Sequence, residues 1–243
     1  ANADKSTVDF TISAAASTFT AGFNGVAGEQ NKSICTGSNI SYSIDYKALA
    51  GFSGTTTFGV SGNPAGTTVT FSPTSINANG TVTMTVNNTT GATPGFYTLA
   101  VTATSGAITK NTNFYLDLLN SNFGTTNLTA PANNAVGQNV SLNLTWAANS
   151  NASGYNVEVA TDSGFTNIIS TGTTTATSYS VSGLTQGTNY FWRVQPFNVA
   201  CIGTFTSSYK FTTGTINCTS FASTNIPITI NSGGTPTINS TLT

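Results

Sequence analysis

The three cysteines have the most distinctive chemistry in this 243-residue chain. Cys35 stands alone, whereas Cys201 and Cys218 lie close together in sequence. This spacing fits neither a zinc site, which needs close Cys or Cys/His pairs, nor a CxxC redox motif. We therefore predict a disulfide between Cys201 and Cys218, which in the chain-entropy model contributes about 3 kcal/mol. Two buried thiols are the alternative, and the state of Cys35 stays open.

Histidine is absent from the sequence. Its absence excludes Ser-His-Asp and Cys-His nucleophiles, the HExxH zinc helix and any histidine-ligated metal. We predict no cofactor, because no DxDxDG-like cluster of carboxylates is present to bind calcium. A single structural calcium bound by backbone carbonyls stays open.

Carboxylates are the remaining candidates for acid/base chemistry. Asp45 lies between Ile44 and Tyr46, and Glu158 is placed in the same way within a second alternating run. Since apolar neighbours in a strand point inward, both acids should point to solvent on different parts of the protein. We therefore predict no catalytic residue and no enzyme activity for this segment. The acids considered are Asp4, Asp9, Glu29, Asp45, Asp117, Glu158 and Asp162.

Two further motifs have structural explanations. Asp162-Ser-Gly164 resembles half of an aspartic peptidase dyad, but its position after a strand favours a turn. Arg193 follows Trp192 and should lie on the outer face beside Phe191, either stacked on an aromatic ring or covering the sheet surface.

Composition limits the possible partners. Charged residues make up 5% of the chain and the net charge is −1, so there is no basic surface for nucleic acid or an anionic membrane. No apolar run reaches the roughly 20 residues of a membrane span, and the start of the sequence lacks a signal-peptide apolar region. We expect a mature product or an excised segment that is monomeric and contacts a protein or a polysaccharide.

Period-2 alternation runs through the whole chain, which predicts an all-β protein with short strands and regular turns. We expect two tandem β-sandwiches, over residues 1–121 and 122–214, and a linker with a short extra β segment over 215–243. In the second sandwich the predicted inward positions are Val140, Leu142, Leu144, Trp146, Tyr155, Val157, Val159, Tyr179, Val181, Tyr190, Trp192, Val194, Tyr209 and Phe211.

The stretch from Leu184 to Val194 predicts the corner of a sandwich. Leu184 lies six residues before Tyr190, with a turn of the chain between them, and Trp192 continues the inward face of the strand. This pattern is the sequence form of a tyrosine corner, in which the tyrosine is buried and its hydroxyl bonds nearby backbone. With Trp146 on an earlier strand, these residues indicate scaffold rather than a ligand platform.

These residues resemble a known family. Pro131, Trp146, Tyr155-Asn-Val-Glu-Val, the corner and Phe211 are similar to a fibronectin type III domain over about 123–214. Residues 8–118 resemble immunoglobulin-like modules of secreted bacterial proteins, in Gly59-Val-Ser-Gly-Asn-Pro-Ala-Gly66 and in Pro94-Gly-Phe-Tyr-Thr-Leu99. The tail, in Ser223-Thr-Asn-Ile-Pro-Ile-Thr-Ile230, resembles the opening of a proprotein-convertase P-domain.

This order of modules is similar to the accessory region of secreted Bacteroidetes-type proteins, often reprolysin-like metallopeptidases. The resemblance implies a non-catalytic spacer and contact segment that is secreted or held at the bacterial cell surface. An adhesin or a carbohydrate-binding module is the alternative.

Overall fold

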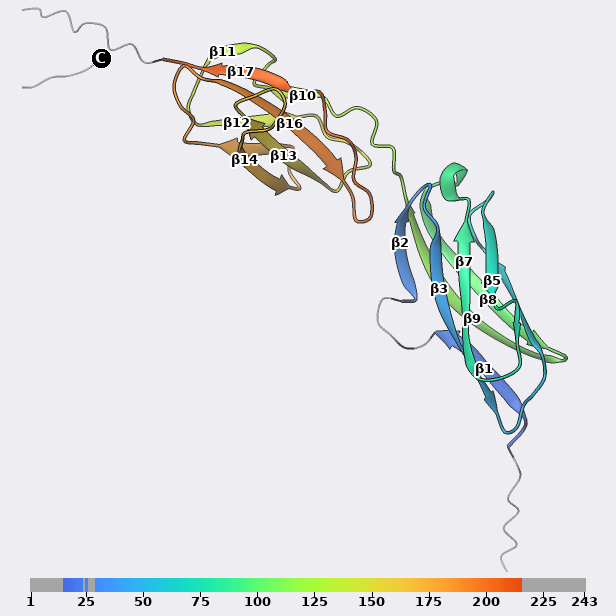
Figure 1. The fold of residues 1–243 in the computed structure, drawn as a ribbon. Helices are drawn as coiled ribbons and strands as arrows, with labels where there is room; N and C mark the ends of the chain where they lie inside the picture. Colours follow the sequence, from blue (N-terminus) through green and yellow to red (C-terminus); the bar gives the residue numbers. More distant parts are fainter. Residues whose placement is uncertain (1–14, 24, 26–28, 216–243) are drawn as a thin grey trace, which may run out of the picture.

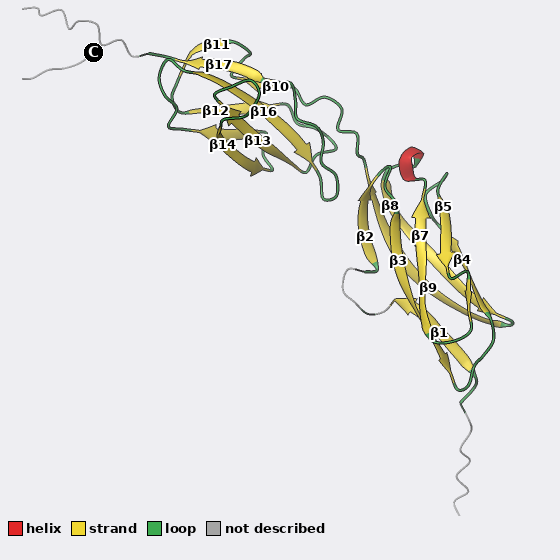
Figure 2. Cartoon of the chain, in the orientation of Figure 1, coloured by secondary structure: helices red, strands yellow, loops and turns green. Residues whose placement is uncertain are grey.

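The computed structural model describes residues 15–23, 25 and 29–215. Regular structure in this part of the chain is β, apart from one 3₁₀ turn, η1 (Thr89–Gly91). Two β-sandwiches follow one another along the chain (Figure 1, Figure 2). The predicted all-β sandwich fold is therefore confirmed.

The N-terminal sandwich is built from two facing sheets. Their strand orders are β1-β3-β7-β5 and β2-β9-β8-β4-β6. The strands are β1 (Thr18–Phe23), β2 (Asn31–Cys35), β3 (Ile40–Leu49), β4 (Thr56–Ser61), β5 (Thr68–Ser72), β6 (Ser75–Ile76), β7 (Gly80–Asn87), β8 (Gly95–Ser105) and β9 (Ile108–Leu119). Alternate residues of β3, β7, β8 and β9 face inward, and the core includes Tyr42, Met84, Leu99 and Phe114, each at most 1% exposed.

The C-terminal sandwich has a three-stranded sheet, β10-β12-β15, and a five-stranded sheet, β11-β17-β16-β13-β14. Its strands are β10 (Leu128–Ala130), β11 (Ala135–Gln138), β12 (Leu142–Trp146), β13 (Gly154–Ala160), β14 (Ile168–Thr174), β15 (Ser178–Val181), β16 (Asn189–Phe197) and β17 (Tyr209–Thr213). Its buried core is separate from that of the first sandwich. The exact domain boundaries stay predictions, and residues 216–243 lie outside the described residues.

One predicted core position is wrong. Val140 is 36% exposed, although Leu142 and Leu144 after it face the core. Val140 lies between the end of β11 and the start of β12, so the inward alternation of β12 does not extend to it. Its carbonyl accepts a hydrogen bond from the Leu184 backbone N–H, at 3.0 Å.

The corner around Tyr190 holds the C-terminal sandwich together. Tyr190 is 3% exposed, and its hydroxyl accepts a hydrogen bond from the Thr185 backbone N–H at 2.8 Å. Leu184 is buried beside it. Trp146 and Trp192 are buried too, and neither indole N–H has a hydrogen-bond partner among the described residues. These aromatic side chains are core residues, so they offer no platform to a ligand.

Replacing Tyr190 with phenylalanine tests the corner. The Tyr190→Phe variant leaves the Thr185 N–H without its partner, so the free energy of unfolding should fall by about 1–3 kcal/mol. Both tryptophans lie in the C-terminal sandwich, so tryptophan fluorescence during urea unfolding follows this sandwich alone. Tyr209→Phe is the control, since its hydroxyl makes no hydrogen bond within the described residues, and it should change stability by less than about 0.5 kcal/mol. Equal effects from the two variants would contradict the corner's role.

Candidate functional site

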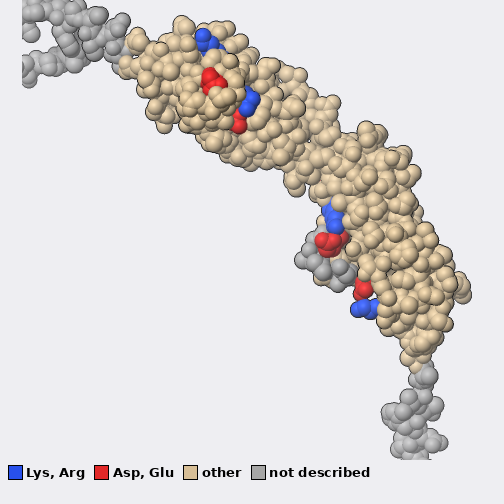
Figure 3. All heavy atoms as spheres, viewed as in Figure 1, with Lys and Arg blue, Asp and Glu red and all other residues tan. Residues whose placement is uncertain are grey.

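Most of the described acidic side chains are already engaged. Glu158 pairs with Arg193 at 2.7 Å, Glu29 with Lys32 at 2.8 Å, and Asp45 with Lys47 at 3.3 Å. Figure 3 shows the few charged side chains scattered over a face that is otherwise uncharged. Within the described ranges no three His, Cys, Asp or Glu residues come together as a metal site would require. Three of the described carboxylates are thus paired with cations.

Asp162 organises the turn after β13. One carboxylate oxygen accepts hydrogen bonds from the backbone N–H and the hydroxyl of Thr166, both at 3.0 Å, and the other accepts one from the Asn167 N–H at 2.8 Å. These backbone donors, Thr166 first, lower the pKa of the Asp162 carboxyl. Asp162-Ser-Gly164 is therefore a turn in the structure, as predicted.

The Asp162 turn also places an aromatic ring on Arg193. The guanidinium carbon lies 3.9 Å from the ring centroid of Phe165 and 4.1 Å from that of Phe205. Its Nε donates to Glu158 at 2.8 Å. Stacking therefore occurs, but on rings from two loops rather than on Phe191. Because its charge is paired with Glu158 and its guanidinium is stacked on two aromatic rings, we assign Arg193 a structural role.

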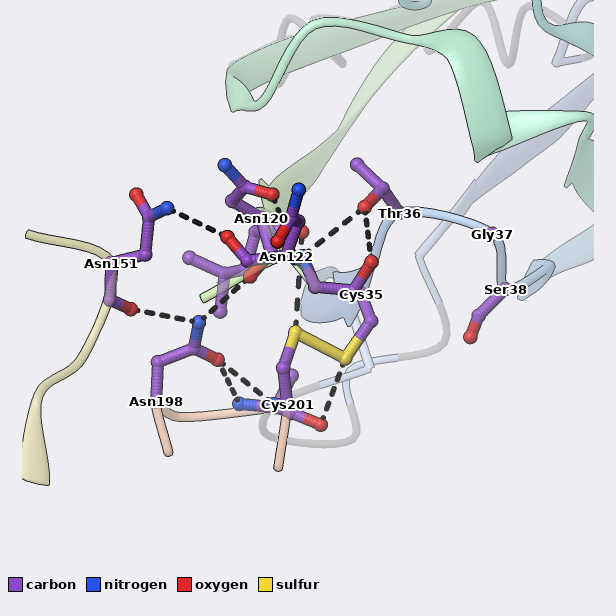
Figure 4. Close-up of a disulfide and its surroundings, with 12 residues drawn as sticks. Cys35, Thr36, Gly37, Ser38, Asn120, Asn122, Asn151, Asn198 and Cys201 are labelled. Carbon is purple, nitrogen blue, oxygen red and sulfur yellow. Dashed lines mark hydrogen bonds between the residues drawn. A yellow bond between two sulfur atoms is a disulfide. The ribbon is translucent and has the colours of Figure 1, made fainter. Parts of the chain in front are cut away.

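The described disulfide joins the two sandwiches. Cys35, at the end of β2, is bonded to Cys201, in the loop between β16 and β17 (Figure 4). Their Cα atoms lie 5.5 Å apart, within the usual range for a disulfide. The predicted Cys201–Cys218 bond is thus wrong, because Cys201 is already bonded to Cys35; Cys218 itself lies outside the described residues.

Asparagine side chains fasten the linker between β9 and β10 to the C-terminal sandwich. The Asn198 amide donates to the Asn120 carbonyl at 3.2 Å, and the Asn151 amide donates to the Asn122 carbonyl at 2.9 Å (Figure 4). The Asn149 amide donates to the carbonyl of the next linker residue. Each bond satisfies a linker carbonyl that has no strand partner, so the linker follows a fixed path.

Both sandwiches hold the linker in further ways. The hydroxyls of Thr36, just after Cys35, and Ser121 are hydrogen-bonded at 2.8 Å. Phe123 is 7% exposed and packs beside Gly203, where a Cβ atom would approach the ring to 2.8 Å. Glycine at position 203 therefore leaves room for the ring. The disulfide and these contacts together fix the linker at both ends.

An exposed aromatic face lies on the outer side of β8, β9 and β2. The Phe96 side chain is 68% exposed, and its ring centroid lies 5.8 Å from that of Tyr115, with 19° between the planes. Strand register places Asp117 opposite both Phe96 and Ser33. Together with Asn31 and Lys32, these side chains line an open hollow. We refer to Phe96, Tyr115, Asp117 and Ser33 as the outer platform.

The sequence contained part of the signal for this platform. Apolar residues alternate along β9 at Phe114, Leu116 and Leu118, and this pattern points Tyr115 and Asp117 outward. The pairing of β8 with β9, which brings Phe96 opposite Asp117, is set by the hairpin between them and was not predicted. The bond between Cys35 and Cys201 spans 166 positions, and no local sequence pattern predicts it.

Changing Asp162 should make the stability of the C-terminal sandwich depend differently on pH. Because the Asp162 pKa is lower in the folded protein than its ordinary value of 3.8, the carboxylate stabilises the fold above that pH and loses its effect as the pH falls below it. Asp162→Asn should therefore lower the urea midpoint at pH 7, and the difference from the wild type should narrow below about pH 4. Tryptophan fluorescence measures both midpoints, and Ser163→Ala in the same turn is the control. A difference that is constant with pH would contradict this account.

Known proteins support the fold of the second half. The fibronectin type III domain family matches residues 129–212. A crystal structure of domains from titin has a TM-score of 0.56 at 16% identity, covering 82% of this chain and 68% of that one, which shows the fold alone. A Fn3-like protein from Clostridium thermocellum is 28% identical over 36% of this chain and 98% of its own, with a TM-score of 0.29. The FN1–FN3 domains of chicken CNTN1 are 14% identical, covering 81% of this chain and 64% of that one, with a TM-score of 0.43. No curated protein matches the chain.

The predicted resemblance over 123–214 is confirmed by this match and by the buried corner at Tyr190. The chain therefore contains a fibronectin type III domain, and the family model matches it over residues 129–212.

Proposed function

We propose that this chain is a non-catalytic accessory segment that holds two β-sandwich modules at a fixed angle and presents their surfaces to a partner. The observation that carries the proposal is the disulfide between Cys35 and Cys201, which joins one sandwich to the other. A flexible tether needs no such bond. Hydrogen bonds from three asparagine amides to consecutive parts of the linker support the same function.

The disulfide and the fibronectin type III domain favour a secreted or cell-surface protein. Disulfides persist in oxidising compartments outside the cytosol, and fibronectin type III domains are generally non-catalytic modules. In the described part of the chain, no helix has the length and apolar character of a membrane span.

The parent protein is a secreted metallopeptidase in this proposal. Support for it comes from the sequence resemblance alone, through the order of an immunoglobulin-like module (residues 1–121), a fibronectin type III module (122–214) and a P-domain-like start (215–243). The catalytic domain then lies elsewhere in the parent, because this sequence has no histidine for an HExxH helix.

Breaking the disulfide should loosen the junction. In a variant with both Cys35→Ser and Cys201→Ser, only hydrogen bonds worth about 1 kcal/mol each, together with side-chain packing, keep the modules in place. Small-angle X-ray scattering should then show a larger radius of gyration and a broader distribution of interatomic distances. Wild-type protein treated with reductant should behave in the same way.

Cys218→Ser is the matched control for this experiment, because it removes a cysteine without breaking the junction. It should give the wild-type scattering curve. If the double variant also scatters like the wild type, the disulfide does not set the angle between the modules and the proposal of a rigid spacer fails.

A further inference from the structure

The outer platform combines an apolar surface with an available acid. Phe96 is the aromatic side chain among the large exposed hydrophobic residues, and the Tyr115 ring stacks beside it, with the two ring planes nearly parallel. The Tyr115 backbone is held from behind, because the buried Tyr42 hydroxyl donates to its carbonyl at 2.9 Å. The exposed Phe96 ring and the Tyr115 ring beside it therefore give an aromatic surface on a well-held part of the sheet.

Asp117 is the acid at the centre of the platform. It forms no ion pair within the described residues, and its hydrogen bond with the Ser33 hydroxyl is long, at 3.5 Å. Glu158 and Asp162, by contrast, are held by short bonds. The Asp117 carboxylate therefore keeps acceptor capacity for a ligand beside the exposed ring of Phe96.

An open groove continues from the platform to the junction. Asp117 also borders a second hollow, which is lined by Gly95 on the N-terminal sandwich and by Asn151 and Val199 on the C-terminal one. Val199 is 81% exposed and comes from the same loop as Cys201. The disulfide thus keeps both sides of this groove in one arrangement.

The chemistry of the platform selects among ligand classes. Lys32, the cation that also lines the hollow, is already paired with Glu29 at 2.8 Å, so phosphates of nucleic acids or anionic lipids would meet the unpaired Asp117 carboxylate. An apolar protein surface would bury that carboxylate without a partner, which is unfavourable. One carboxylate is too few for a calcium site. A sugar ring suits both the exposed aromatic ring and the unpaired acid, because its C–H face packs on an aromatic ring while its hydroxyls donate to a carboxylate.

We infer that the outer platform is a binding site for a neutral polysaccharide. One sugar ring packs on Phe96 and Tyr115, its hydroxyls donate to Asp117, and the polysaccharide extends along the groove towards Val199. This inference goes beyond the spacer role and can fail separately from it, because the variants that test it leave the disulfide intact.

Affinity electrophoresis of the full chain through gels containing xylan, mixed-linkage β-glucan, glucomannan, α-mannan or starch, with pull-down on cellulose and chitin, tests the site. At least one polysaccharide should retain the wild type. Phe96→Ala and Asp117→Asn should each weaken that retention about tenfold or more, which corresponds to about 1.4 kcal/mol. Both residues lie on the surface of strands, and unchanged thermal unfolding will show that the variants fold.

Two matched variants serve as controls. Val136→Ala removes an exposed apolar side chain from the C-terminal sandwich, and Asp45→Asn neutralises an acid on the other sheet of the N-terminal sandwich. Both should bind like the wild type. The inference is overturned if no polysaccharide in the panel retains the protein, or if retention survives Phe96→Ala. Dimerisation that depends on concentration and disappears in Phe96→Ala would assign the platform to a second copy and would also overturn it.

Discussion

The covalent bond between Cys35 and Cys201 is the constraint on which the arrangement of this protein depends. It connects the end of an edge strand in one sandwich with a loop of the other, across 166 positions. Each sandwich has its own buried core. The bond is therefore needed to fix the position of one sandwich relative to the other and not for the fold of either. The linker then runs close to the disulfide, where Asn198 and Ser121 can reach their partners. Without the bond, the same contacts would have to hold two modules against thermal motion.

The two sandwiches use their aromatic residues differently. In the C-terminal one, Tyr190 and both tryptophans are buried, and the stacked and ion-paired Arg193 has no free face. That module is a scaffold whose loops meet the junction. In the N-terminal one, Phe96 remains outside the core beside Asp117, which has no salt bridge with any described residue. The exposed ring and the acid of the outer platform therefore lie on the first sandwich, next to the groove at the junction.

Local sequence pattern predicted the parts of the structure that are local. Alternation along β9 placed Phe114 in the core, and the spacing of Leu184 and Tyr190 predicted the corner, because strand geometry fixes side-chain direction residue by residue. Val140 was misplaced because alternation does not show where a strand begins. The disulfide partner of Cys201 was predicted wrongly for a different reason. Proximity in sequence favoured Cys218, whereas pairing with Cys35 depends on how two separately folded modules meet. The ring contacts of Arg193 depend likewise on two loops that only the folded sheet brings together.

Peptide mapping under non-reducing conditions tests the central claim most directly. Lys32 and Lys47 bracket Cys35, Arg193 and Lys210 bracket Cys201, and Lys210 separates Cys201 from Cys218, so trypsin places each cysteine in a different peptide. After alkylation of free thiols, the account predicts that peptide 33–47 is linked to peptide 194–210 and that Cys218 carries the alkyl group. A link between peptides 194–210 and 211–243, with Cys35 alkylated, would contradict it.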